Sequence, residues 1–181
     1  MINLALFIAS FGQLLAACKL TLLIAFCSTF IGMVGGTLIA LGQRSPMALL
    51  RYPLDTYVAI IRGTPMIVQI VFWYYGLQLP FDPLIVAIIA IGCNSAAYIS
   101  QVMATGIRAV DKGQLEAAQV MGFTKTQQIR YIILPQALRA VLPSLGNELV
   151  TMIKDSSLAY IIGVNELFKE SRNLISTTYD V

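Results

Sequence analysis

The chain has 181 residues, of which 57% are hydrophobic and 12% charged, and its formal net charge is +3. A soluble domain carries about a quarter charged residues, so this composition excludes an ordinary soluble protein and predicts an integral membrane protein. The small net charge does not indicate nucleic acid as a partner, and the absence of histidine from the sequence excludes histidine-based catalysis and histidine metal sites.

The three cysteines do not suggest a metal centre. Cys18, Cys27 and Cys93 lie in apolar runs without the spacing of metal ligands. The N-terminal stretch is apolar but has no basic residue before Lys19, so it does not resemble a secretory signal peptide. We therefore expect no metal site and no cofactor, and we interpret the cysteines as small buried side chains.

The first predicted span is residues 20–41, a run of 22 residues without a charge. Such a run can cross a hydrocarbon core of roughly 30 Å. Gly32 and Gly36 have the spacing that allows two helix backbones to approach closely. The sequence therefore predicts that this face packs against another span, and residues 43–62 follow as a mixed connection.

The second predicted span is interrupted by the motif Arg62-Gly63-Thr64-Pro65. Pro65 suits the first turn of a helix, with Thr64 as its cap. Residues 66–79 are too short to cross alone. We expect a span that begins near Tyr57 and kinks at the motif.

The third predicted span is the uncharged run of residues 84–107. Asn94, Tyr98, Gln101 and Thr105 lie on one stripe of it, spaced by four, three and four residues. Polar groups in hydrocarbon are costly unless they face protein or a watery cavity. Hydrogen bonding between helices and the lining of a cavity are both consistent with this stripe.

Residues 108–135 form a polar segment between apolar runs. Asp111, three residues before a glutamine, predicts a helix start. Gly122 suits the position just past a helix end, where a left-handed backbone is needed. Thr124, also three residues before a glutamine, predicts a second helix that ends at Pro135. The segment is thus expected to fold as a helix, a glycine corner and another helix.

This segment resembles the cytoplasmic coupling loop of bacterial ABC importer permeases. The matching positions are Glu116, Ala117, Ala118, Gly122, Ile132, Leu134 and Pro135. In that family the first short helix docks in a cleft on the ATP-binding subunit. The resemblance implies an ATPase contact through the following residues: Glu116, Ala117, Ala118, Gly122 and Phe123. An amphipathic surface helix with a glycine stop is the alternative, which seven matched positions disfavour.

The last predicted span covers residues 136–153, with Pro143 expected to bend it. At 100° per residue the polar side chains of residues 144–155 share an arc of about 120°. An ionisable group exposed to lipid costs roughly 2.5–3.5 kcal/mol, so this face should point into the bundle. Glu148 lacks an obvious local partner and could pair with the cationic end of an amino acid, whereas Lys154 and Asp155 could simply neutralise each other. The hypothetical substrate path is Asn94, Tyr98, Gln101, Asn147, Glu148, Thr151, Lys154 and Asp155.

The distribution of basic residues predicts the orientation. Eight of twelve lie in the two connections expected on one side, namely Arg44, Arg51, Arg62, Arg108, Lys112, Lys125, Arg130 and Arg139. The positive-inside rule places that side in the cytoplasm. Residues 158–164 are too short to span and are expected to be re-entrant or interfacial. Permeases of the resembled family usually continue with one more span, so we expect the usual last span to be absent and the C-terminus to be extracytoplasmic.

The sequence has no Gly-x-x-x-x-Gly-Lys-Ser/Thr motif, so ATP hydrolysis would belong to a partner chain and this chain is not expected to be an enzyme. The resemblance covers about residues 15–175, and the segments at 62–65 and 153–158 resemble the polar amino-acid branch, of the histidine, glutamine and arginine type. It implies one all-α domain over residues 1–181, a polytopic transmembrane bundle of about four spans plus a coupling helix in the bacterial plasma (inner) membrane.

The function implied by the resemblance is that of the permease subunit of an ATP-driven importer for polar amino acids. The implied partners are a separate ABC ATPase subunit, an extracytoplasmic solute-binding protein, a second permease copy or a related permease, and the lipid bilayer. Two alternatives come from other classes. An ion-coupled secondary transporter of small polar solutes would explain charges within spans but not the coupling loop. A membrane-embedded enzyme is disfavoured because no set of nucleophile, base and metal can be assembled.

Overall fold

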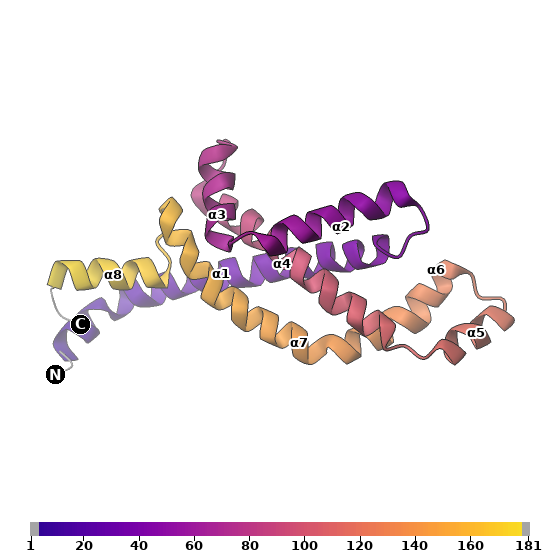
Figure 1. Cartoon of the computed structure of the whole chain (residues 1–181). Helices are drawn as coiled ribbons and strands as arrows, with labels where there is room; N and C mark the ends of the chain where they lie inside the picture. The colour runs from indigo at the N-terminus through magenta and orange to yellow at the C-terminus, as the bar shows by residue number, and fades with distance from the viewer. Residues whose placement is uncertain (1–3, 179–181) are drawn as a thin grey trace.

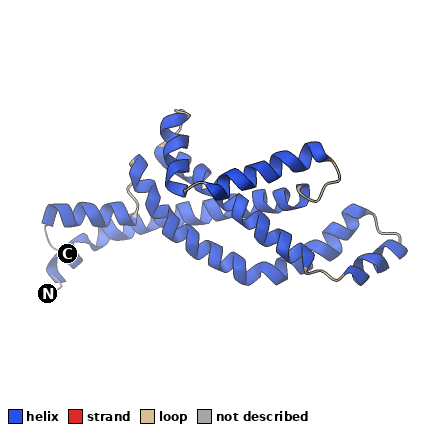
Figure 2. Cartoon of the chain, viewed as in Figure 1, coloured by secondary structure: helices blue, strands red, loops and turns tan. Residues whose placement is uncertain are grey.

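The structure, a computed structural model, describes residues 4–178, and this part of the chain contains helices and no strand (Figure 2). The long helix α1 (Leu4–Gly42) runs along the molecule and packs against α4 (Pro83–Arg108), which also packs against α7 (Leu134–Asp155) (Figure 1). The prediction of an all-α bundle is confirmed.

The contact between α1 and α4 depends on glycines, as the sequence predicts. A Cβ atom on Gly36 would lie 2.8 Å from the carbonyl oxygen of Ala96 and 2.9 Å from the Ile99 side chain. A Cβ atom on Gly32 would likewise collide with Ser95. Only glycine therefore allows the two backbones to lie this close.

By length and composition, two helical stretches can cross a membrane: Ser10–Gly42, with mean hydropathy 2.1, and α4, with mean hydropathy 1.8. A third span is possible across a bend. Helix α2 (Ala48–Gly63) forms one side of this bend. Helix α3 (Met66–Val71) and the π-helical turn η1 (Phe72–Gly76) form the other side, and the two sides together can count as one span. The expected fourth span, α7, has 22 residues and is long enough at about 33 Å. It is less apolar than α1 and α4 because it carries polar as well as charged side chains.

Helix α2 begins earlier than expected, at Ala48 and not near Tyr57. Leu50, Leu54 and Val58 recur every four residues and therefore share one face of a helix. The leucines lie against the end of α1 at Gly42, and Val58 is buried. These contacts make residues 48–56 helical, where the sequence suggested a connection.

The expected kink is present as a turn of 109° between α2 and α3. Thr64 is not the cap of α3, which was the prediction, because Pro65 occupies that position without a side-chain bond. The Thr64 hydroxyl instead donates to the carbonyl oxygen of Ile60 at 3.0 Å and so completes the end of α2. The amide of Gln69 donates to the carbonyl oxygens of Ile61 and Thr64, at 2.8 and 3.1 Å, and holds the break in shape.

The coupling loop lies at the same end of the molecule as the turn after α1 (Figure 1). It contains α5 (Lys112–Val120), α6 (Lys125–Gln128) and a π-helical turn, η2 (Ile129–Ile133). The second helix does not end at Pro135, as predicted, but passes through η2 directly into α7, which has a proline in its first turn. Proline has no N–H to donate, and the π-helical turn η2 directly before it is the irregularity at which the helix continues past Pro135.

The local signals in this loop are confirmed. The Asp111 side chain accepts a hydrogen bond from the backbone N–H of Gln114 at 3.3 Å. Gly122 has a φ angle of +80°, the left-handed conformation that glycine adopts at no cost. Thr124 and Gln127 form the reciprocal bonds of a capping box.

At the opposite end, the apolar run after Ser156 forms a 3-10 helix, η3 (Ser156–Ile162), and α8 (Leu167–Thr178) lies beside α1 (Figure 1). Glu166, only 1% exposed, caps α8 by accepting from the backbone N–H groups of Phe168 and Lys169, each at 2.8 Å. Ala159 and Ile162 of η3 belong to the buried core, so this short segment packs into the bundle and does not span a membrane.

Candidate functional site

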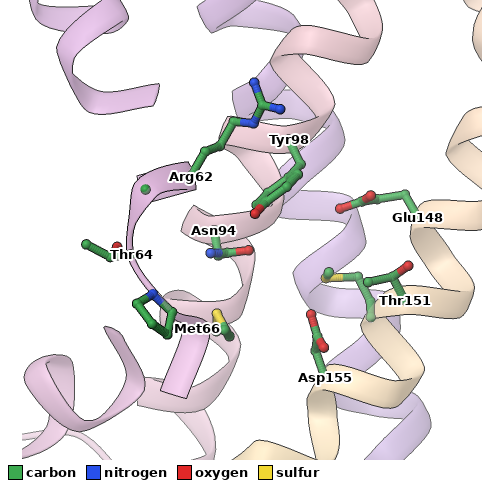
Figure 3. A pocket seen from close by; sticks show the side chains of 11 residues that line it. Arg62, Thr64, Met66, Asn94, Tyr98, Glu148, Thr151 and Asp155 are labelled. Carbon is green, nitrogen blue, oxygen red and sulfur yellow. The ribbon is translucent and has the colours of Figure 1, made fainter. Parts of the chain in front are cut away.

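A cavity of about 410 Å³ lies between the break in α2–α3 and the helices α4 and α7 (Figure 3). Its volume is in the range of small-molecule sites. The lining residues are Arg62, Gly63, Thr64, Pro65, Met66, Asn94, Tyr98, Glu148, Thr151, Met152 and Asp155.

Two helices contribute the polar side chains that the sequence predicted. Asn94 and Tyr98 are one turn apart on α4, and Glu148, Thr151 and Asp155 follow one face of α7 at intervals of three and four residues. The Ser95 hydroxyl lies 3.5 Å from a carboxylate oxygen of Glu148. The packing of α4 on α7 thus brings two carboxylates, an amide and hydroxyl groups to one cavity.

Arg62 is a site residue that sequence reasoning missed. We expected it in a cytoplasmic connection, but α2 carries it about 21 Å from the start of that helix, at the 1.5 Å rise of an α-helix. Its guanidinium carbon lies 5.3 Å from the centroid of the Tyr98 ring, a cation–π contact. An arginine directly before a glycine and proline break, between apolar runs, was the available signal.

The charges in the cavity are arranged at separate places. Figure 3 shows Arg62 and Asp155 at opposite ends of the site, with Glu148 on the wall that faces α2 and α4. A molecule that carries both a cation and an anion can therefore meet carboxylates with its positive end and a guanidinium with its negative end.

The remaining predicted path residues lie elsewhere. Gln101 lines a second cavity of about 370 Å³, nearer the coupling loop, together with Thr105 of the same polar stripe and Ser144 of α7. Asn147 and Lys154 are exposed and line neither cavity. The predicted stripe is therefore divided between two hollows of the same α4–α7 groove.

The coupling loop presents an exposed tip. Glu116, Ala117 and Gly122 are exposed and Phe123 is half-buried, whereas Ala118 is 3% exposed and faces the interior of the loop. Ala118 therefore supports the loop from inside and does not contribute to its surface. Val120 and Met121 lie within residues 116–123, the segment expected to contact the ATPase, although the sequence pattern predicts no individual role for them.

Val120 is 90% exposed and Met121 74% exposed, directly before the glycine corner. Apolar side chains gathered at a projecting tip are typical of a contact surface. Their signal in the sequence was a pair of apolar residues at the end of a short polar helix.

A helical membrane bundle with a charged central cavity and a projecting helical loop is the architecture of a transport permease. Residues 32–180 match the family described as "Binding-protein-dependent transport system inner membrane component". The match covers most of the chain, and the chain belongs to this family.

Named relatives support the assignment. The chain is 40% identical over 181 residues to "Probable amino-acid ABC transporter permease protein YckA" of Bacillus subtilis (strain 168), covering 98% of this chain and 80% of that protein. It is 34% identical over 171 residues to "Glutamine transport system permease protein GlnP" of Escherichia coli (strain K12), covering 92% of this chain and 78% of that protein.

Solved structures share the fold. One, described as "Crystal structure of an amino acid ABC transporter with histidines", superposes with a TM-score of 0.89 at 32% identity and covers 99% of this chain and 86% of that chain. An inward-facing form of the MetNI methionine ABC transporter superposes with a TM-score of 0.81 at 23% identity, covering 96% and 85% of the two chains. The permease fold expected from the coupling-loop motif is confirmed.

Proposed function

We propose that this chain is the permease subunit of an ATP-driven importer for polar amino acids in the bacterial inner membrane. The observation that carries the proposal is the cavity between the α2–α3 break, α4 and α7, with Arg62 on one wall and the carboxylates of Glu148 and Asp155 on another. Relatives named as amino-acid and glutamine permeases support the same substrate class.

The residues of the cavity have complementary tasks. Glu148 and Asp155 bind the cationic end of the amino acid, and Arg62, stacked on Tyr98, binds its carboxylate. Thr151 lies one turn from Glu148 and adds a neutral hydroxyl. Gln101 and Thr105 continue the polar path towards the coupling loop.

The coupling loop binds the separate ATPase subunit. Val120 and Met121 provide an apolar tip that a cleft on the partner would bury, and Glu116 provides a carboxylate beside it for a basic group. Gly122 sets the direction of the tip through its positive φ angle.

The complete importer also contains a second permease, either another copy of this chain or a related chain, and a solute-binding protein on the outer side. The family description names dependence on a binding protein. An ion-coupled secondary transporter acting alone does not account for an exposed apolar tip next to a glycine corner.

The test is Glu148→Gln in the complete importer, reconstituted in proteoliposomes. This change keeps the shape of the side chain and removes its charge, and the loss of a charged hydrogen bond of about 1.5–3 kcal/mol corresponds to roughly 10- to 150-fold weaker binding. Uptake of L-glutamine or L-arginine should fall accordingly, whereas assembly and basal ATPase activity stay intact. Glu170→Gln on α8, outside the cavity, is the matched control. Unchanged uptake of both amino acids by the Glu148 variant would place the path elsewhere.

A further inference from the structure

Gln69 is a buried polar residue that lies next to the cavity but is not one of its lining residues. It is 6% exposed and lies on α3, behind the α2–α3 break. Its Nε2 atom donates to the carbonyl oxygens of Ile61 and Thr64 at 2.8 and 3.1 Å, and to the Thr64 hydroxyl at 2.8 Å. Its Oε1 atom accepts from Nδ2 of Asn94 at 3.1 Å.

The chemistry of these partners determines how both amides are oriented. Backbone carbonyl oxygens accept hydrogen bonds and never donate, so the NH₂ group of Gln69 must face Ile61 and Thr64. The oxygen of the Gln69 amide must then face Asn94. Because this oxygen can only accept, Asn94 must turn its own NH₂ group towards Gln69.

The orientation of Asn94 decides what the cavity offers to a ligand. With its nitrogen held by Gln69, its carbonyl oxygen faces the cavity. Figure 3 shows the Asn94 oxygen on the side of Glu148 and its nitrogen on the side of Thr64. This oxygen joins the carboxylates of Glu148 and Asp155 as a third acceptor.

We propose that Gln69 is a positioning residue that sets ligand selectivity by holding the Asn94 carbonyl oxygen towards the cavity. The inference rests on the proposed function of the cavity as the amino-acid site. In this proposal, the part of the cavity between Asn94 and Glu148 binds an N–H donor of the ligand. In an amino acid this donor is the ammonium group. A reversed Asn94 amide would present N–H groups to that ammonium and repel it.

The hydrogen bonds that orient Asn94 also stabilise the break between α2 and α3. The Gln69 amide holds Ile61 and Thr64 on one side of the break and Asn94 of α4 on the other. These bonds therefore connect the wall that carries Arg62 to the acceptor on α4.

The experiment measures ligand binding to the complete complex in nanodiscs, with L-arginine and L-glutamine as probes. Each is paired with its α-hydroxy analogue, which has no ammonium group. Gln69→Met keeps approximate volume but removes both the donor and the acceptor. The affinity for the bound amino acid should fall about tenfold or more, the value of a hydrogen bond to a charged group. The affinity for the hydroxy analogue should change much less, so the selectivity ratio falls.

Three variants separate positioning from a general structural role. Gln69→Glu keeps an acceptor for Asn94 and should keep the selectivity ratio even if the break is less stable. Gln128→Met removes another buried glutamine, whose Nε2 donates to the carbonyl oxygen of Phe123 in the coupling loop, and should leave the ratio unchanged. In an Asn94→Leu background, Gln69→Met should have no further effect on the ratio.

Two results would overturn the inference while leaving the proposed function in place. One is an equal loss of affinity for the amino acid and its hydroxy analogue in Gln69→Met. The other is a ratio that falls as far in Gln69→Glu as in Gln69→Met. If the wild-type complex binds neither amino acid, or if Glu148→Gln binds both as the wild type does, the proposed function itself fails and this inference fails with it.

Discussion

The glycine corner of the coupling loop allows a test in which conformation and volume are separated. Gly122 has a φ angle of +80°, and a Cβ atom built on it would have no heavy atom within 4 Å. A substitution therefore costs free energy only through the backbone. The left-handed conformation costs an L-residue about 1–2 kcal/mol, is tolerated better by asparagine and is worst for β-branched residues.

These values predict a graded series of variants. Gly122→Asn should remain close to wild type, and Gly122→Ala should weaken ATPase binding about 5- to 30-fold, the equivalent of 1–2 kcal/mol. Gly122→Val should weaken it more than alanine does. Titration of the ATPase subunit onto the permease in nanodiscs measures the affinity, and uptake per ATP hydrolysed in proteoliposomes measures coupling.

The matched control is Gly146→Ala, a glycine with the same open surroundings but in the interior of helix α7. Alanine is favoured over glycine in a helix, so binding of the ATPase should not fall. If Gly122→Val binds the ATPase and couples as well as the wild type, the left-handed corner has no part in docking. An effect that follows side-chain volume, with asparagine worse than alanine, would refute the conformational argument.

Three further predictions concern packing, capping and docking. Gly36→Leu should force α1 and α4 apart at a cost of about 1–3 kcal/mol and lower the melting temperature of the permease in detergent. Gly12→Leu should not lower it, because a Cβ atom at Gly12 meets nothing within 4 Å. Equal melting temperatures of the two variants would contradict the close approach of α1 and α4. Glu166→Ala should cost about 1 kcal/mol of local stability in α8 and speed the hydrogen exchange of its first-turn amides. Glu166→Gln should restore most of the protection of these amides. Unchanged exchange in the alanine variant would mean that the cap is dispensable. Aspartate at both Val120 and Met121 should weaken ATPase binding about tenfold or more, because a charge would be buried against the partner, without changing the melting temperature; unaltered binding would show that the apolar tip is not the contact.

Some features of the site could be predicted because their causes are local in the sequence. The caps at Asp111 and Thr124 involve partners three residues away, and the glycine corner follows from one residue. The inward face of α7 follows from helical periodicity, which placed Glu148 and Asp155 together. Each of these signals is complete within one or two turns of chain.

The features that could not be predicted depend on contacts between distant segments. The place of Arg62 depends on a continuous α2 and a break held by Gln69, whose bonds join residues up to 25 positions apart. The division of the polar stripe, with Asn94 in one cavity and Gln101 in another, depends on how α4 crosses α7. Periodicity identifies a face of a helix, but only the crossing decides what that face meets.

The connectivity of the coupling loop has a thermodynamic consequence. Its first helix follows α4 after three residues, and its second continues without interruption into α7, so the loop joins the two helices that carry Asn94 and Glu148. The tip that we propose for the ATPase contact is therefore joined through short helical segments to both helices that line the proposed ligand cavity. If α4 and α7 can take two spacings, a partner that binds one of them more tightly changes the affinity for the ligand. By reciprocity the ligand changes the affinity for that partner by the same factor. Under the proposed function, ligand occupancy of the cavity and binding of the ATPase are thus two variables of one equilibrium.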